Sequence, residues 1–171
     1  MARAPEVWLR GPVAGVPPLL QPVAHAILQA REEIDSLVAD LPAPILWTRP
    51  AGLASAGFHL QHITGVLDRL ATYARDEPLN ETQRAFLAAE GATRADNMRD
   101  TSALVAALHH QVDRVLEQLR NTPESSLGEV RHVGRARLPS TVMGLLFHAA
   151  EHTQRHVGQL LVTIRVQAAP S

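Results

Sequence analysis

Four long stretches of the chain repeat apolar residues every three or four positions. This spacing gathers the apolar side chains on one face of a helix, where they can pack against other helices. The pattern predicts long helices over residues 19–39, 55–75 and 95–120, and a fourth from the cap signal at residues 139–141 to residue 166. No run alternates apolar and polar residues long enough to predict a β-strand. We therefore expect an all-α protein.

Capping residues and prolines mark where these helices begin and end. Ser55 is a typical N-cap for the second long helix. Asn80, with a glutamine three residues later, predicts a capping box that opens a short helix, which Gly91 closes. Residues 40–54 contain prolines and are too long for a tight turn, so we expect this connection to cross the bundle. With a polar loop over residues 121–139, the chain is predicted to form a four-helix bundle with a crossover connection.

The length and composition favour a single domain over residues 1–171, with residues 1–18 and 167–171 at its periphery. Hydrophobic residues make up 46% of the chain and charged residues 19%. There is enough apolar material for a packed core and too little charge for intrinsic disorder. A globular domain follows from these proportions.

Charge and cysteine content exclude several classes of function. All 16 basic residues are arginine, and 17 acidic residues balance them, so neither DNA nor RNA is an expected partner. The chain has no cysteine, which excludes disulfides, thiolate metal sites and cysteine nucleophiles. No stretch approaches the roughly 18 apolar residues of a membrane span. The first residues also lack the apolar core of a signal peptide, so we expect a cytoplasmic protein that does not bind membranes.

Histidine is conspicuous at nine residues, and three of them follow one another at four-residue steps in the last helix. His148, His152 and His156 each lie roughly 40° further round the helix than the one before, beside its apolar face. Two imidazoles one turn apart can bind one metal ion together, as the histidine pair of zincin helices does. The alternative is that these are partly buried polar residues, hydrogen-bonded to their neighbours.

A metal ion at these histidines needs a third ligand from another helix. His62 is the best candidate, because it shares a helical line with inward-pointing apolar residues, and His59 is the substitute. Gly65, one turn after His62, leaves room for a ligand or for a close approach between helices. Three imidazoles leave coordination positions for water or substrate, which is typical of catalytic zinc sites. Zinc, nickel, iron and cobalt would all accept such a ligand set.

Other polar residues are candidates to assist the site. Glu151 and Gln159 are placed to accept hydrogen bonds from imidazole N–H groups. Arg69 and Arg155 are candidates to bind an anionic substrate through a guanidinium fork. The simpler interpretation of all four is a solvated helix face. The remaining histidines are expected at the core boundary, on the surface or in loops: His25, His109, His110 and His132.

Four segments carry a resemblance to a known family: residues 10–25, 57–69, 135–144 and 146–161. Their most specific feature is one histidine on the second long helix combined with a His-x-x-x-His motif on the last helix. In these segments, and in the order and spacing of its helices, the chain resembles the DinB superfamily of DinB/YfiT-like metalloenzymes. The resemblance covers about residues 10–166.

The resemblance implies a four-helix bundle with an unusual crossover and a divalent metal ion, zinc or nickel in the first place. The implied ligands are His62, His152 and His156, with His148 in an accessory position. Homodimers are common in the family, so a second copy of the chain and a small-molecule substrate are the implied partners. Some relatives are thiol transferases or isomerases that use a low-molecular-weight thiol such as bacillithiol, mycothiol or glutathione. Others are regarded as hydrolases linked to DNA damage.

Two classes of function remain open. In a metal-dependent enzyme, the metal would lower the pKa of a bound thiol or water and give a nucleophile near neutral pH. The chain supplies no cysteine, and its last-helix motif has no well-placed glutamate base. We therefore expect thiol S-transfer to small electrophiles, with hydrolysis as the alternative, and no catalytic side chain is assigned. The other class is a non-catalytic bundle that binds metal or a small ligand in a stress response.

Overall fold

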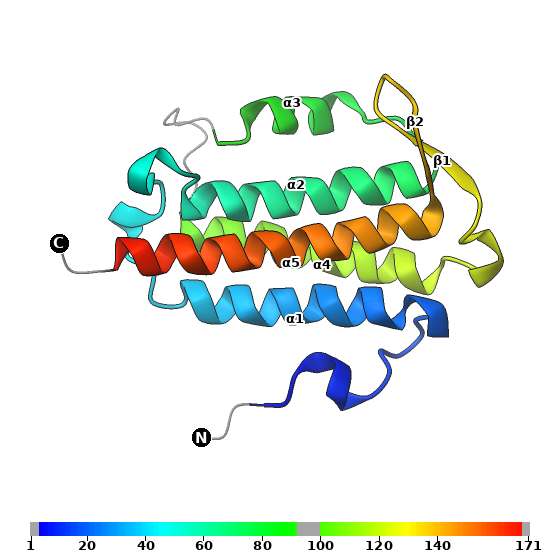
Figure 1. Ribbon diagram of the computed structural model, residues 1–171, viewed down its shortest axis with the longest axis horizontal. Helices are drawn as coiled ribbons and strands as arrows, with labels where there is room; N and C mark the ends of the chain where they lie inside the picture. Colours follow the sequence, from blue (N-terminus) through cyan, green and yellow to red (C-terminus); the bar gives the residue numbers. More distant parts are fainter. Residues whose placement is uncertain (1–3, 92–99, 169–171) are drawn as a thin grey trace.

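Four long helices form the body of the protein. The computed structural model describes residues 4–91 and 100–168. The helices of the bundle are α1 (Gln21–Val38), α2 (Ala56–Ala74), α4 (Thr101–Arg120) and α5 (Val142–Gln167). The shorter α3 (Glu81–Ala89) lies alongside α2 on its outer side (Figure 1). Short 3-10 turns occur at Val7–Arg10, Pro18–Leu20, Ala43–Ile45, Pro50–Gly52 and Glu124–Ser126. The predicted four-helix bundle is confirmed.

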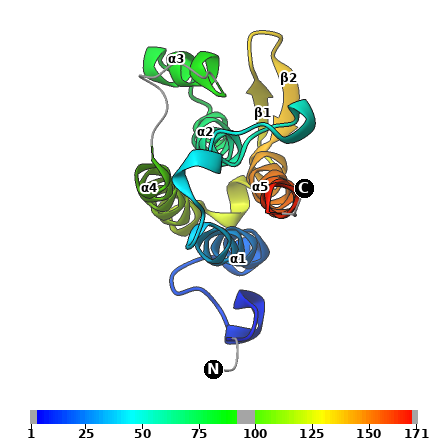
Figure 2. The same cartoon turned by 90° about the vertical axis from the view of Figure 1, so that its left-hand side faces the viewer.

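The order of the helices around the bundle differs from their order along the chain. Both α1 and α2 pack against α4 and α5, so α1 and α2 lie diagonally opposite each other, as do α4 and α5 (Figure 2). Helices α1 and α5 run in one direction, and α2 and α4 run in the other (Figure 1). Residues 39–55 and 121–141 therefore each connect diagonal helices. The expected crossover is present, and the second diagonal connection leads directly into α5.

Capping residues fix the helix starts as their positions in the sequence predict. The side chains of Ser55 and Thr141 each accept a hydrogen bond from the backbone N–H three residues further on. Asn80 and Gln83 form the expected capping box, in which each side chain accepts from the backbone N–H of the other residue. These bonds satisfy N–H groups that have no partner inside the helix. They place the first turns of α2, α3 and α5.

Helix α4 starts with Asp100 as its N-cap, and the expected start near residue 95 lies outside the described residues.

The interior of the bundle is apolar. Each of the four long helices contributes fully buried side chains to one continuous core. The largest of them include Ile27, Ile34, Leu60, Leu67, Leu108, Leu119, Leu146 and Leu160. Burial of the apolar side chains of this core is the main favourable contribution to the packing of the helices.

The connection between α4 and α5 is more ordered than the polar loop expected there. It contains two antiparallel strands, β1 (Val130–Val133) and β2 (Leu138–Thr141), in a register that places Val130 opposite Thr141. Gly134 in the turn between them has a φ of 65°, which glycine adopts without steric cost. The prediction that the chain has no strand was wrong here. Each strand spans four residues, which is too short for a period of two to stand out.

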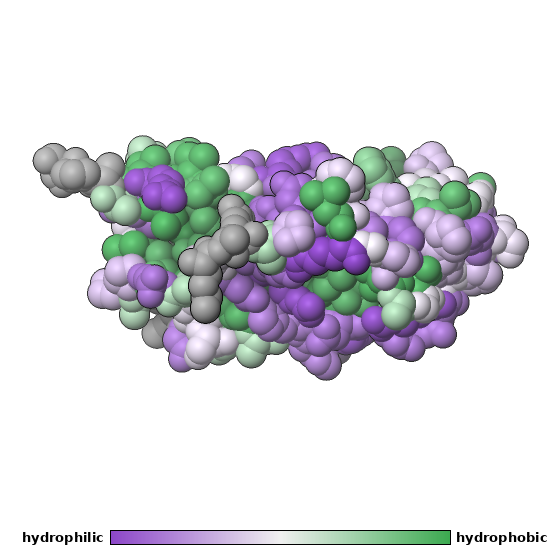
Figure 3. Space-filling view, turned by 90° about the horizontal axis from the view of Figure 1, so that it is seen from below, coloured by the Kyte–Doolittle hydropathy of each residue, from purple (hydrophilic) through white to green (hydrophobic). Residues whose placement is uncertain are grey.

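The N-terminal segment lies along α1, outside the bundle (Figure 1). Val7 is buried, and Arg10 forms an ion pair with Glu32 of α1 at 2.6 Å. Seen from this side, hydrophilic residues cover much of the middle, and hydrophobic residues gather at the end where α5 finishes (Figure 3). Within residues 4–91 and 100–168, no helix is both long enough and apolar enough to cross a membrane.

Candidate metal centre

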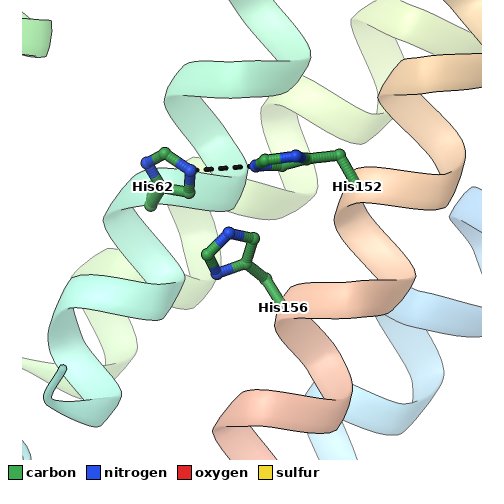
Figure 4. A group of neighbouring side chains, drawn as sticks. All are labelled: His62, His152 and His156. Carbon is green, nitrogen blue, oxygen red and sulfur yellow. Dashed lines mark hydrogen bonds between the residues drawn. The ribbon is translucent and has the colours of Figure 1, made fainter. Parts of the chain in front are cut away.

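Three histidines from two neighbouring helices face one another between α2 and α5 (Figure 4). His62, His152 and His156 each offer one ring nitrogen, and these nitrogens all lie within 4.8 Å of one another. The Nε2 atoms of His62 and His152 are 3.0 Å apart. The ring centroids of His62 and His156 are separated by 4.4 Å. The structure thus brings together three of the histidines that the sequence analysis selected.

Helix geometry explains why these side chains meet. His152 and His156 lie one turn apart on α5, so their rings leave the helix on the same side. They border a buried stripe of that helix which includes Thr153 and Val157. On α2, His62 lies beside the fully buried Ile63. Because α2 and α5 are antiparallel neighbours, the His62 ring is held opposite the α5 pair.

Two of these imidazoles have a lowered pKa, which favours their neutral form. Burial, followed by the charge of His62, lowers the pKa of His156 to about 3. The pKa of His152 is also lowered, first by burial and then by the charges of His62 and His148. A neutral imidazole keeps a lone pair on one ring nitrogen, and metal ions bind that form. At neutral pH these side chains therefore have the protonation state that a metal ligand needs.

His59 lies behind the group rather than in it. Its Nδ1 is 3.0 Å from Nδ1 of His156, and its side chain is buried. Burial, together with the charge of His62, lowers the pKa of His59 to about 4. The sequence predicts His59 as the substitute for His62. In the structure it contacts one member of the group and leaves the ring of His62 facing the α5 pair.

The buried carboxylate at this site was missed by the sequence analysis. Oε2 of Glu90, just after the end of α3, lies 2.7 Å from Nδ1 of His62. Its other oxygen, Oε1, accepts a hydrogen bond of 2.5 Å from Nη1 of Arg69. The side chain of Glu90 is 6% exposed and that of Arg69 is 11% exposed. Arg69, a candidate for binding an anionic substrate, thus forms its ion pair with a side chain of the protein itself.

Gly65 is the signal in the sequence that relates to this contact. A Cβ atom at position 65 would lie 2.6 Å from Nη1 of Arg69, 2.8 Å from the Phe86 ring and closer still to Oε1 of Glu90. The expected close approach of another element at Gly65 is therefore present, and that element is α3. No local pattern identifies Glu90 as the residue that fills the space, because it lies 28 positions from His62.

An aromatic ring covers another side of His62. The ring of Phe58 stacks on the His62 imidazole, with centroids 5.2 Å apart and an angle of 13° between the planes. Phe58 and His62 lie one turn apart on α2, so the stacking follows from their spacing. The apolar ring limits the directions that the imidazole can take.

The chemistry of the three donors fits a divalent metal ion. Two nitrogens bound at about 2.0–2.1 Å to one tetrahedral zinc ion lie about 3.3 Å apart. The 3.0 Å between the Nε2 atoms of His62 and His152 is close to that separation. In addition, Nδ1 of His152 is buried and has no hydrogen-bond partner among the described residues. Imidazole nitrogens suit zinc, nickel, cobalt and iron alike.

The other candidates on α5 lie on its outer surface. The side chain of His148 is 48% exposed, and its Nδ1 is 2.7 Å from Oε1 of Glu151. Glu151 also pairs with Arg155 at 2.7 Å. Gln159 is exposed. Glu151 therefore contacts His148 and Arg155, and no hydrogen bond joins it to the three grouped histidines.

Three of the remaining histidines contact groups elsewhere. His25 lies 3.0 Å from the carbonyl oxygen of Gly11, and His109 pairs with Asp35 at 2.7 Å. His132, on β1, contacts Arg137 at 3.1 Å. The expectation that these histidines belong to the boundary, surface or loops agrees with these contacts.

Comparisons with known proteins agree with this fold. No curated protein sequence matches the chain. A solved structure, YfiT from Bacillus subtilis, has a TM-score of 0.66 over 94% of each chain, at 13% sequence identity. It is described as a probable metal-dependent hydrolase with an unusual four-helix bundle topology. The family model of the DinB superfamily matches residues 26–160, which include the whole histidine group. The chain belongs to the DinB superfamily.

Proposed function

We propose that the protein is a divalent-metal-dependent enzyme whose metal ligands are His62, His152 and His156. The observation that carries this proposal is the convergence of three imidazole nitrogens within 4.8 Å of one another, on two neighbouring helices. The lowered pKa values of His152 and His156 support it, because they keep these donors neutral. Three protein ligands, rather than four, are typical of catalytic zinc sites.

A divalent ion held by these histidines would lower the pKa of a thiol or water molecule taken as a further ligand. The protein side chains then have to orient the nucleophile and the substrate. The His62 ring is oriented by Phe58 and Glu90, and the one-turn spacing of His152 and His156 on α5 places their rings on the same side of that helix. Arg155 and His148 lie on the exposed side of α5 next to the group, where a substrate can reach them.

Thiol S-transfer to a small electrophile is the reaction that we propose first. Among residues 4–91 and 100–168, the carboxylates in contact with histidines of this region are Glu90 and Glu151, and each is also paired with an arginine. Neither is placed as an unpaired base that could take a proton from water, which favours a nucleophile of lower intrinsic pKa. The chain has no cysteine, so a low-molecular-weight thiol would supply the sulfur.

The proposed reaction balances without an external oxidant or reductant. With an aryl halide as substrate, a bond forms between the thiol sulfur and the ring carbon. The bond from that carbon to the halide breaks, and the halide leaves with the electron pair. The thiol proton passes to solvent.

Metal-dependent hydrolysis is the second candidate, favoured by the description given to YfiT. One set of assays separates the two. Protein loaded with zinc or nickel is incubated with bacillithiol, mycothiol or glutathione and chlorodinitrobenzene, and separately with a nitrophenyl ester. We expect conversion that requires both metal and thiol, that His152→Ala abolishes and that His109→Ala retains. Cleavage of the ester in the absence of thiol would show that the protein is a hydrolase, and thiol transfer would then be the wrong proposal.

A non-catalytic bundle would give a different set of results. If the loaded protein converts neither substrate class, and chelation lowers its melting temperature, the metal serves stability alone. The proposed enzymatic function would then be wrong, although the metal ligands could stand. His109→Ala is the matched control throughout, because His109 pairs with Asp35 on the α1–α4 side of the bundle.

We also propose a homodimer. Hydrophobic residues gather where α5 ends (Figure 3), and exposed apolar side chains of α5 include Val162 and Val166. Light scattering coupled to size-exclusion chromatography measures the mass directly. A monomer at micromolar concentration would contradict this part of the proposal.

A further inference from the structure

We propose that Glu90 is a positioning residue that sets the orientation and tautomer of His62 and ties α3 to the metal centre. This inference rests on the proposed metal centre for its effect on metal binding. Its structural part concerns the His62 ring alone. Neither the family match nor the spacing of residues in the sequence assigns a role to Glu90.

The two nitrogens of His62 have different partners. Nδ1 faces Oε2 of Glu90 at 2.7 Å, and Nε2 faces Nε2 of His152 at 3.0 Å. A carboxylate only accepts hydrogen bonds, so the ring proton of neutral His62 belongs on Nδ1. The lone pair is then on Nε2, the nitrogen that faces α5. Glu90 thus prepares His62 to act as a ligand through the atom that points into the histidine group.

Arg69 holds the carboxylate in place from the other side. It donates to Oε1 of Glu90 at 2.5 Å, while Oε2 faces His62. Arg69 and His62 lie two turns apart on α2, so one carboxylate can bridge them. Both members of the Arg69–Glu90 pair are nearly excluded from solvent. Hydrogen bonds to charged groups are shorter and stronger than neutral ones, so this bridge fixes the direction of the ring.

Gly65 makes the bridge sterically possible. It lies on α2 between His62 and Arg69, and the space beside it that a side chain would fill is occupied by Glu90 and Arg69. A methyl group there would push both polar groups away from their present positions. Gly65, Arg69 and His62 therefore form one binding site for the Glu90 carboxylate.

The bridge also connects α3 to the metal centre. Helix α3 packs against α2, and Glu90 directly follows its last residue. A metal ion bound to Nε2 makes the Nδ1–H of an imidazole a stronger donor, so metal binding and the docking of α3 should support each other. This coupling gives the proposal a readout that does not depend on enzymatic activity.

Glu151 provides a matched control for charge. It neighbours His152 in the sequence, yet it pairs with His148 and Arg155 on the surface. Glu151→Gln removes the same charge close to the metal without removing a hydrogen bond to any of the three grouped histidines. A difference between Glu90→Gln and Glu151→Gln therefore measures the contact rather than the long-range field.

The first experiment measures zinc affinity by competition with a chromophoric chelator, for the wild type, Glu90→Gln and Glu151→Gln. Loss of a hydrogen-bond partner of a ligating histidine typically weakens metal binding about 10- to 100-fold. We expect a loss of that size for Glu90→Gln and a much smaller one for Glu151→Gln. Equal affinities of Glu90→Gln and the wild type would overturn the role in metal binding. A wild type that binds no zinc would instead overturn the proposed function.

The second experiment uses metal-free protein and decides the structural part. Nitrogen-15 NMR of the imidazoles distinguishes the two neutral tautomers. We expect wild-type His62 to carry its proton on Nδ1, and Glu90→Ala to lose this preference. A wild-type His62 with its proton on Nε2 would overturn the proposal, whatever the protein does with zinc.

A pair of glycine variants tests the same contact without changing any polar group. Gly65→Ala should weaken zinc binding to a similar extent as Glu90→Gln, because the added methyl displaces the carboxylate. Gly158→Ala, on α5 near His156, is the control, since a Cβ atom there meets nothing within 4 Å. Amide exchange of α3 should slow on zinc binding in the wild type and in Gly158→Ala but not in Gly65→Ala. Unchanged zinc affinity in Gly65→Ala would count against the bridge.

Discussion

The α2 side and the α5 side of the histidine group hold their imidazoles by different means. On the α2 side, Nδ1 of His62 faces the carboxylate of Glu90, which also binds Arg69. On the α5 side, Nδ1 of His156 faces only the ring of His59. Nδ1 of His152 is buried without a hydrogen-bond partner within the described part of the chain. One side is thus held by a charged network and the other by a neutral contact and by packing.

This difference indicates which ligand sets the geometry of the site. Hydrogen bonds with a charged partner are roughly twice as strong as those between neutral groups. His62 is therefore the firmly oriented ligand in the proposed centre, and the α5 pair can adjust to the ion. The following predictions test this contrast, from the largest effect on zinc binding to the smallest.

Removal of a proposed ligand should have the largest effect. Structural zinc sites of four ligands bind with about 10–16 kcal/mol, or roughly 3 kcal/mol for each ligand. We expect His62→Ala to weaken zinc binding about 100-fold or more, as measured by chelator competition. His109 is a surface histidine that pairs with Asp35, so the His109→Ala variant should bind zinc like the wild type. Equal zinc affinity of the two variants would show that His62 is not a ligand.

Removal of the neutral support should cost less than removal of the charged one. His59→Leu deletes the ring that faces Nδ1 of His156. A neutral hydrogen bond contributes about 0.5–1.5 kcal/mol, so we expect zinc affinity to fall about 2- to 10-fold. The same titration compares this loss with that of Glu90→Gln. A larger loss for His59→Leu would reverse the proposed contrast between the two sides.

Acid should destabilise the metal-free protein through the same histidines. The folded-state pKa is lowered from the ordinary 6.5 to about 4 for His59 and to about 3 for His156, chiefly by burial. The unfolded chain therefore binds more protons than the folded one below pH 6.5. The free energy of unfolding should be nearly unaffected by these groups well above that pH, and it should fall as the pH is lowered from 6.5 to about 4 through His59 and to about 3 through His156.

Urea unfolding of metal-free protein at a series of pH values measures this loss. His59→Leu should lose less stability than the wild type between pH 6.5 and 4, because one of the imidazoles with a lowered pKa is gone. Parallel pH profiles for the two proteins would contradict the assignment of acid sensitivity to His59.

The smallest effect on zinc affinity is expected from a steric clash that does not involve the three grouped histidines. A Cβ atom at Gly57, near the start of α2, would lie 2.8 Å from the Trp47 ring. Overpacking of this kind costs about 1–3 kcal/mol of stability. We expect Gly57→Ala to lower the melting temperature while the folded protein keeps its zinc affinity. A loss of zinc affinity as large as that of Gly65→Ala would mean that the two glycines do not differ in role.

Local sequence patterns predicted the helices and their starts. The apolar periodicity placed the four long helices, and Ser55, Asn80 and Thr141 cap helices as expected. Caps and periodicity depend on residues within one or two turns, so a single sequence contains the information. The β1–β2 hairpin was missed because four-residue strands carry no detectable period.

The three grouped histidines could be selected from the sequence, but the contact that supports His62 could not. The spacing of His152 and His156 is a property of a single helix, so the sequence shows it directly. The Glu90 contact depends on how α3 folds back onto α2, and no local pattern encodes that. Glu151 was expected to accept a hydrogen bond from an imidazole, and in the structure that imidazole is His148 rather than one of the three grouped histidines.

Metal content tests the proposed centre most directly. Elemental analysis of the untagged protein, purified and then reconstituted with zinc or nickel, is compared with the His152→Ala/His156→Ala double variant. We expect close to one metal ion per chain in the parent and none in the variant. A parent that holds no metal after reconstitution, or a double variant that holds as much as the parent, would contradict the assignment of these histidines as ligands.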